Sequence, residues 1–303
     1  MMSFTEDRSD LARAALAAAR RVRIWAKLSA DSPLCIFDLI ENEYRDVIDL
    51  RFKAAPSLEG LYVRGELQQE RAAIIVISSL RPSGRQRTTA GHELGHHEFG
   101  HGSSIDEVRE AGSSERFEPK EYVATQFSSF LLMPKLGVLK AFADRKLKIE
   151  TASAIDVYAV ASQFGVGFST LVNHLTFSLK LLSRPRAEAL KKTTPQSLRE
   201  DVLGYAAQGE LLVVDGHWSG RAIDLSINDH LVVPVGASIE RLGDDAALPV
   251  LELAQRLTVG DVYRARRVGR ARVVSDPMAS YVRVSRSGYE GRSMFRHLED
   301  EDE

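Results

Sequence analysis

Residues 72–100 read AAIIVISSLRPSGRQRTTAGHELGHHEFG and decide the architecture of the first part of the chain. The opening stretch, Ala72 to Ser78, is apolar and β-branched enough to be a central strand. The polar stretch Leu80 to Gly84 ends that strand, and helical character returns from about Gly84 to Gly100, where glycine supplies a stop. The sequence therefore predicts a strand followed by a helix that carries the motif His92-Glu93-Leu94-Gly95-His96.

The HExxH motif has the spacing of a zinc site. Histidines at positions i and i+4 project from one face of a helix, about one turn apart, so His92 and His96 can bind the same Zn²⁺. Glu93 points beside the metal and need not bind it. A bound zinc would activate a water molecule and polarise the scissile carbonyl, while Glu93 would pass the proton to the leaving amine. The motif thus predicts a zinc-dependent metallopeptidase.

A catalytic zinc site usually has three protein ligands. His101 is the nearest candidate in the sequence, but the long metzincin pattern places its third histidine where this chain has Gly102. This mismatch argues against His101 as a metzincin-type ligand.

The alternative is a carboxylate from the next helix, which we expect from about Pro119 to Leu132. Glu115, Glu118 and Glu121 all lie within reach of a chain that folds back. Glu121 is favoured because it precedes the small side chain of Ala124 by about one turn, so that the two helices could pack closely. The residues alone leave the other two glutamates open.

These segments together resemble the ImmA/IrrE family of metallopeptidases, which process or inactivate helix-turn-helix repressors in bacteria and their mobile elements. The resemblance covers roughly residues 10 to 180. It implies that Glu121, thirteen residues before Pro134, is the third zinc ligand. It rests on the strand IIVIS, the approach Arg85-Gln86-Arg87-Thr88-Thr89, the run HELGHHEFGH, Glu121-Tyr122-Val123-Ala124, Phe127 and Leu131-Leu132-Met133-Pro134.

Three positions depart from the family pattern. Thr88 replaces the usual Phe before the motif, Gly91 replaces the usual Ala, and Thr125 replaces the usual Asn after Ala124. We expect none of them to touch the proposed zinc ligands. The departures therefore concern the substrate pocket and leave the proposed ligands unchanged.

The pattern of elements predicts an α+β protein with three regions. Residues 1–135 would form the zinc metallopeptidase domain, including a helix near Asp10–Ser29 and strands at Val47–Phe52 and Gly60–Arg64. Residues 136–195 would form a helical region that resembles a helix-turn-helix. Residues 196–303 would form a β-rich sandwich or barrel with a sensing or recognition role and an acidic tail.

Composition narrows the classes of protein. The chain has 303 residues, a formal net charge of −2 and a single cysteine, Cys35, which excludes an intramolecular disulfide framework and a cysteine-rich zinc site. No run of about 18 apolar residues and no secretory signal is present. We therefore expect a cytoplasmic protein with Zn²⁺ as cofactor and no membrane partner.

Other features allow two interpretations each. Gly60–Arg64 could be an edge strand that a peptide substrate extends, or an ordinary sheet strand. His97 and His101 could contact substrate, or lie behind the ligands or on the surface. The polar residues 103–117 are expected to be a mobile connection.

DNA binding is considered but not favoured. Lys180, Arg184 and Lys191 give positive charge near the helix-turn-helix-like region, but such helix pairs often serve as packing units. The five arginines of Arg264–Arg272 suit nucleic acid or an acidic partner, yet alternation along an exposed β-hairpin explains them nearly as well.

The leading hypothesis is a zinc endopeptidase that cleaves a specific, XRE-type helix-turn-helix repressor and so relieves repression in a stress-response or mobile-element circuit. The alternative is a non-proteolytic regulator that binds and sequesters a DNA-binding partner, as in a toxin–antitoxin or phage-type module.

Overall fold

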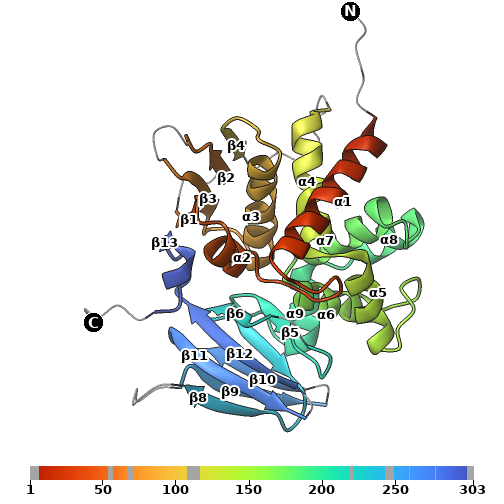
Figure 1. Cartoon of the computed structure of the whole chain (residues 1–303). Coiled ribbons are helices and arrows are strands. Elements are labelled where there is room, and N and C mark those ends of the chain that lie inside the picture. The colour runs from red at the N-terminus through yellow and green to blue at the C-terminus, as the bar shows by residue number, and fades with distance from the viewer. Residues whose placement is uncertain are drawn as a thin grey trace, which may run out of the picture. The chain divides into compact units, whose positions relative to one another are not determined.

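The structure is a computed structural model, and it describes residues 7–53, 57–66, 71–107, 117–218, 221–242, 249–258, 260–276 and 278–298. The helical content of 41% and strand content of 26% confirm a mixed protein. The chain divides into two compact units, Met1–Gly137 with Glu290–Ser293, and Val138–Tyr289 with Met294–Glu303. Figure 1 shows the elements of each unit.

A five-stranded sheet with the order β13-β1-β3-β2-β4 forms one layer of the first unit. Strand β1 pairs in parallel with β3, and all other pairs are antiparallel. The alternating burial of β3, with Ile75 and Ile77 fully buried, follows from its apolar, β-branched sequence. The strands are β1 (Val47–Phe52), β2 (Leu58–Val63), β3 (Ala73–Ser78), β4 (Ser104–Glu107) and β13 (Gly291–Arg292).

One expectation about this sheet is wrong, and one pair of alternatives is decided. Strand β2 lies between β3 and β4, so Gly60–Arg64 belongs to an ordinary sheet strand and not to an edge strand. Residues 104–107, which were expected to belong to a mobile connection, form β4 at the edge, because their backbone pairs with β2. The rest of that connection, residues 108–116, lies outside the described residues.

Helices of the first unit pack on this sheet. Helix α3 packs against β2, β3 and α4, and α4 also packs against α1. The predicted bounds of β1 and α4 are those observed, and Pro119 opens α4 at a position that tolerates proline. The helices are α1 (Arg8–Trp25), α2 (Ile36–Glu43), α3 (Ser83–Glu98) and α4 (Pro119–Leu132).

Small residues bring α3 and α4 together. A Cβ atom at Gly95 would lie 2.9 Å from the Cα atom of Ala124, and one at Gly91 would collide with Ser128. Larger side chains at these two glycines would therefore push the helices apart. Arg23 of α1 fixes the far end of α4, where its guanidinium donates to the carbonyl of Leu131 at 2.7 Å.

The second unit begins with helices. Helix α6 ends at Gly165, whose φ of +67° is the left-handed conformation that glycine adopts readily, and α7 follows at a bend of 99°. A helix-turn-helix function for this pair stays a prediction. The helices, the first of which spans the boundary between the units, are α5 (Lys135–Asp144), α6 (Ala154–Phe164), α7 (Phe168–Asn173), the π-helix η2 (His174–Ser178), α8 (Arg184–Lys191) and α9 (Pro195–Leu203).

Two four-stranded sheets follow, with the orders β5-β7-β10-β9 and β6-β12-β11-β8. Side chains of both sheets form one core, in which Leu231, Val273 and Val282 are fully buried, so the expected C-terminal sheets are confirmed. The strands are β5 (Leu211–Val213), β6 (Ile223–Ser226), β7 (His230–Val233), β8 (Ser238–Leu242), β9 (Leu251–Leu257), β10 (Gly260–Ala265), β11 (Gly269–Ser275) and β12 (Met278–Ser285).

The arginines of Arg264–Arg272 do not lie on one hairpin. Strands β10 and β11 belong to different sheets, although they are adjacent in the sequence. Arg266 pairs with Glu252 at 2.9 Å and Arg272 with Glu240 at 3.3 Å. The explanation by a single exposed β-hairpin is therefore wrong, because the two strands do not pair with each other.

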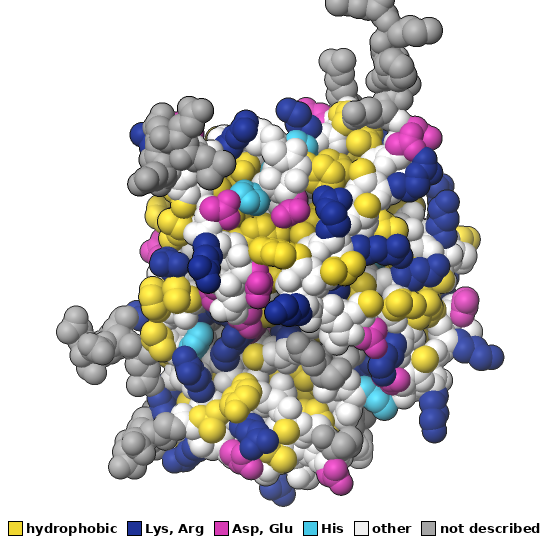
Figure 2. Space-filling view, in the orientation of Figure 1, with side chains coloured by type: hydrophobic (Ala, Val, Ile, Leu, Met, Phe, Trp, Pro, Cys, Tyr) yellow, Lys and Arg dark blue, Asp and Glu magenta, His cyan; other side chains and the backbone are white. Residues whose placement is uncertain are grey.

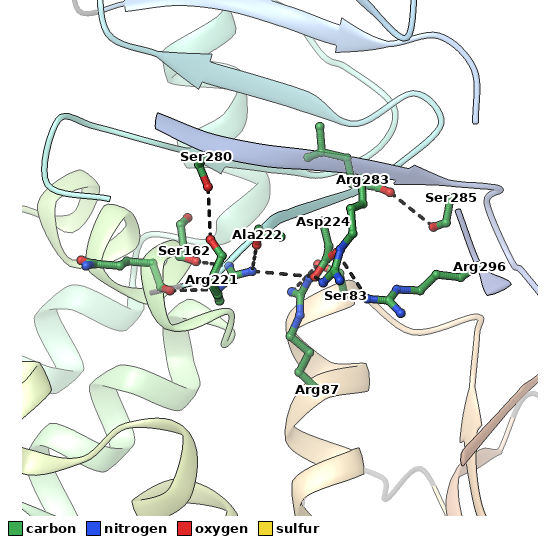
Figure 3. A network of polar contacts seen from close by, with 12 residues as sticks. Ser83, Arg87, Ser162, Arg221, Ala222, Asp224, Ser280, Arg283, Ser285 and Arg296 are labelled. Atoms are coloured by element: carbon green, nitrogen blue, oxygen red, sulfur yellow. Dashed lines mark hydrogen bonds and ion pairs between the residues drawn. The ribbon is translucent and has the colours of Figure 1, made fainter. Parts of the chain in front are cut away.

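A buried polar network joins segments of the second unit (Figure 3). Asp224 accepts from Arg283 at 2.6 and 3.1 Å and from Arg296 at 3.4 Å. The guanidinium of Arg221 lies 3.9 Å from the same carboxylate and also donates to the carbonyls of Ser162, Gln163 and Ala222.

Among the described residues, no single helix has the length and apolar character needed to cross a membrane. The bent pair Ala154–Phe164 and Phe168–Ser178 reaches those limits only when its two halves are taken together. Both halves contain many buried residues, including Val157, Val160 and Leu171.

Candidate metal centre

Helices α3 and α4 bring two histidines and a glutamate together in the first unit. His92 and His96 lie one turn apart on α3, and Glu121 lies in the first turn of α4. The Nε2 atom of His92 is 3.1 Å from the Nε2 atom of His96 and 3.1 Å from the Oε2 atom of Glu121. The Oε1 atom of Glu121 is 3.5 Å from His96 Nε2.

These distances fit a tetrahedral zinc site. Bonds of about 2.0 to 2.1 Å in tetrahedral geometry separate the ligand atoms by roughly 3.4 Å. One donor atom from each of the three side chains lies within 4.8 Å of the others, so the group could hold a metal ion. Two imidazoles and one carboxylate are also a donor set of catalytic zinc enzymes.

Glu93 is fully buried beside this group. Neither of its carboxylate oxygens has a hydrogen-bond partner of standard geometry among the described residues. Burial raises the pKa of Glu93 to about 8, against the opposing charge of His92. A Cβ atom at Gly60 would collide with the Glu93 carboxylate, so glycine on β2 leaves room for this side chain. A buried, unsatisfied carboxylate next to three potential ligands suits a group that handles protons.

Asp106 is a charged neighbour that the sequence did not point to. Its Oδ2 atom lies 3.0 Å from His92 Nε2, because β4 places it beside α3. Burial lowers the pKa of His92, but hydrogen bonds with Asp106 and Glu121 outweigh it and raise that pKa to about 10. Hydrogen bonds from His92 and His96 hold the pKa of Glu121 well below its usual range. No local signal marked Asp106, since it lies in a short polar segment.

The outer nitrogens of the two histidines also have partners. The hydroxyl oxygen of Thr125 lies 3.2 Å from His92 Nδ1. The expectation that no departure from the family pattern touches a proposed ligand is therefore wrong, because α4 brings residue 125 one turn after Glu121. The Nδ1 atom of His96 lies 2.9 Å from Nδ1 of His101.

The remaining candidates that the structure describes are not members of the three-residue group. His97 has its Nδ1 atom 3.2 Å from the hydroxyl of Tyr62, and its Nε2 atom 3.7 Å from Asp46. Glu118 precedes α4 as its N-cap and is not part of the group. Glu115 lies outside the described residues. Burial and the charge of His96 lower the pKa of His101 to about 4.

The group lies near the surface of the first unit. The side chains of His92 and Glu121 are 12% and 23% exposed, whereas that of His96 is 1% exposed. Figure 2 shows histidine side chains among acidic and hydrophobic ones over α3. Two of the three side chains are therefore partly accessible to solvent.

Comparison with known proteins agrees with this geometry. Residues 47–176 match the model of the M78 peptidase family, described as the IrrE N-terminal-like domain. Peptidases of this family are typically metal-dependent. A search of curated proteins gave no match. The matched segment contains the whole His92–His96–Glu121 group, and the match confirms the resemblance of this part of the chain to the ImmA/IrrE family of metallopeptidases.

Proposed function

We propose that this protein is a cytoplasmic zinc endopeptidase that cleaves a specific XRE-type helix-turn-helix repressor, and so relieves repression in a stress-response or mobile-element circuit. The observation that carries the proposal is the mutual placement of His92, His96 and Glu121 beside the buried Glu93. The repressor substrate follows from the family resemblance. The peptidase domain is assigned to residues 1–135, the helical region to 136–195 and the recognition domain to 196–303.

The residues divide the chemistry between them. His92, His96 and Glu121 would hold the zinc ion, which supplies activation of water and polarisation of the scissile carbonyl. Glu93 takes a proton from the attacking water and delivers it to the leaving amine. Burial suits this role, because a carboxylate with a raised pKa is a stronger base than one in water.

Strand β4 offers a place for an extended peptide. Within the described residues it is an edge strand of the sheet, and its residue Asp106 lies 3.0 Å from His92. A peptide that adds to β4 would pass beside the proposed ligands, and backbone hydrogen bonds would fix its register. Ile105, which is 68% exposed, would contact one of its side chains.

The test is cleavage of a candidate repressor encoded beside this protein. Zinc-loaded wild type and Glu93→Gln are incubated with the purified repressor, and fragments are quantified by mass spectrometry. We expect one cleavage site for wild type and a loss of rate of about 10³-fold or more for Glu93→Gln, in the range of losses seen when catalytic groups are removed.

Glu98→Gln is the matched control on the same helix, since Glu98 accepts from the hydroxyl of Tyr44 at 2.8 Å and faces away from the group. It should cleave like wild type. Undiminished cleavage by Glu93→Gln would exclude this mechanism. Derepression by Glu93→Gln without any cleavage would instead identify a non-proteolytic regulator that sequesters its partner.

A further inference from the structure

Helix α3 ends in a Schellman cap directly after the motif. Gly100 has a φ of +62°, the left-handed conformation that glycine adopts without strain. Its N–H donates to the carbonyl of His97 at 3.0 Å, and the N–H of His101 donates to the carbonyl of His96 at 2.9 Å. In this cap the residue after the left-handed one folds back over the last helical turn. The contact is commonly apolar, but here it joins two histidines.

The two imidazoles meet through their Nδ1 atoms, which lie 2.9 Å apart. The ring centroids are 4.9 Å apart. On the other side of its ring, His96 directs Nε2 toward His92 and Glu121. Phe99 stacks against His101 with ring centroids 5.9 Å apart and limits the movement of that ring.

Metal binding fixes the direction of this hydrogen bond. A neutral imidazole carries one proton, and binding through Nε2 requires that nitrogen to be unprotonated. His96 as a ligand therefore keeps its proton on Nδ1 and donates it to the nearest acceptor. That acceptor is Nδ1 of His101, so the proton of His101 resides on its own Nε2 atom.

We propose that His101 is a positioning residue for the metal, and that it occupies the place behind His96 that a carboxylate, a backbone carbonyl or a water takes in most zinc proteins. It fixes the tautomer and the ring orientation of His96. The proposal rests on the proposed function only in that His96 binds zinc. His101 is not a fourth ligand, because the structure places it behind His96 and outside the group of three donors.

The experiment measures zinc affinity, by competition with a chelator, for wild type and three variants. His101→Phe keeps the ring contact with Phe99 but removes the acceptor. His101→Asn returns an acceptor oxygen close to the place of Nδ1. His97→Phe is the control, since it removes a neighbouring histidine whose Nδ1 atom contacts Tyr62 and no proposed ligand.

We expect His101→Phe to weaken zinc binding about 10- to 100-fold, His101→Asn to stay within about 3-fold of wild type, and His97→Phe within about 2-fold. Nitrogen-15 spectra of the zinc-loaded wild type should show the proton of His96 on Nδ1 and that of His101 on Nε2. The spectra report proton position directly, which a purely structural role of His101 would not determine.

Wild-type affinity in His101→Phe would overturn the proposal, as would a loss in His101→Phe that His101→Asn does not recover, or a proton on Nδ1 of His101. Each of these leaves the zinc site itself standing. Absence of zinc binding in wild type would instead overturn the metal centre, and this inference with it.

Discussion

The two units of the chain each contain a carboxylate with little exposure to solvent, but the surroundings of the two carboxylates are opposite in charge. Asp224 in the second unit is 11% exposed and is surrounded by the guanidinium groups of Arg221, Arg283 and Arg296. Glu93 in the first unit is fully buried, and neither of its oxygens has a hydrogen-bond partner of standard geometry in the described part of the chain. Two acidic groups, Asp106 and Glu121, further raise the pKa of Glu93.

The paired carboxylate of Asp224 has a structural role, whereas we propose a functional role for the carboxylate of Glu93. A buried charge costs several kcal/mol unless it is paired, so folding selects for arrangements like that of Asp224. The arrangement of Glu93 contributes nothing comparable to stability. The position of Glu93 beside the three proposed metal ligands supports a functional role, since unsatisfied polar groups and groups with shifted pKa values gather at functional sites.

Removing the charge of Asp224 should have the largest effect on stability. Asp224→Asn leaves the buried guanidinium groups of Arg221 and Arg296 and the partly buried one of Arg283 without this carboxylate. We expect a loss of about 3 to 5 kcal/mol in the free energy of unfolding. Urea denaturation followed by circular dichroism measures it. Glu240→Gln is the control for an exposed pair, because the Glu240 side chain is 48% exposed; its loss should be under about 1 kcal/mol. Equal losses of unfolding free energy in Asp224→Asn and Glu240→Gln would show that the network around Asp224 stabilises the protein no more than an exposed ion pair does.

Removing the charge of Glu93 is expected to raise the free energy of unfolding of the metal-free protein, whereas removing the charge of Asp224 lowers it. The pKa of Glu93 is about 8 in the folded protein, against 4.5 for an ordinary exposed glutamate. Below pH 4.5 both states are protonated; between pH 4.5 and 8 the unfolded state releases a proton that the folded state keeps, so stability falls as pH rises.

Glu93→Gln lacks this loss of stability with rising pH, because the glutamine side chain does not ionise. It should therefore gain about 1 to 3 kcal/mol relative to wild type between pH 4.5 and 8, with no further gain above that range. The measurement is urea denaturation across this pH range in the presence of a chelator. A difference between the two proteins that stays constant with pH would show that burial does not destabilise the Glu93 carboxylate.

The sequence predicted those parts of the site that depend on local spacing. His92 and His96 are one helical turn apart in any helix, and the small side chain of Ala124 indicated the close packing that brings Glu121 within reach. The structure adds Gly95, which lies opposite Ala124. The strand Val47–Phe52 and the helix Pro119–Leu132 were likewise marked by their own composition and by proline.

Parts that depend on distant pairing were not predictable in this way. Strand β13 comes from residues 291–292 and pairs with β1, more than 200 residues earlier. Strand β4 has four residues and a polar sequence, so only its pairing with β2 defines it. Asp106 therefore had no signal. Two of the three arginines around Asp224, Arg283 and Arg296, lie 59 and 72 positions away from it in the sequence.

The central claim is that His92, His96 and Glu121 bind one zinc ion beside Glu93, and zinc content tests it most directly. Wild type, Glu93→Gln, His92→Ala and Glu121→Ala are loaded with zinc, desalted and measured by elemental analysis. We predict about one zinc per chain in wild type and in Glu93→Gln, and less than about 0.1 in the two ligand variants. A wild type that retains no zinc, or ligand variants that retain as much as wild type, would contradict the account.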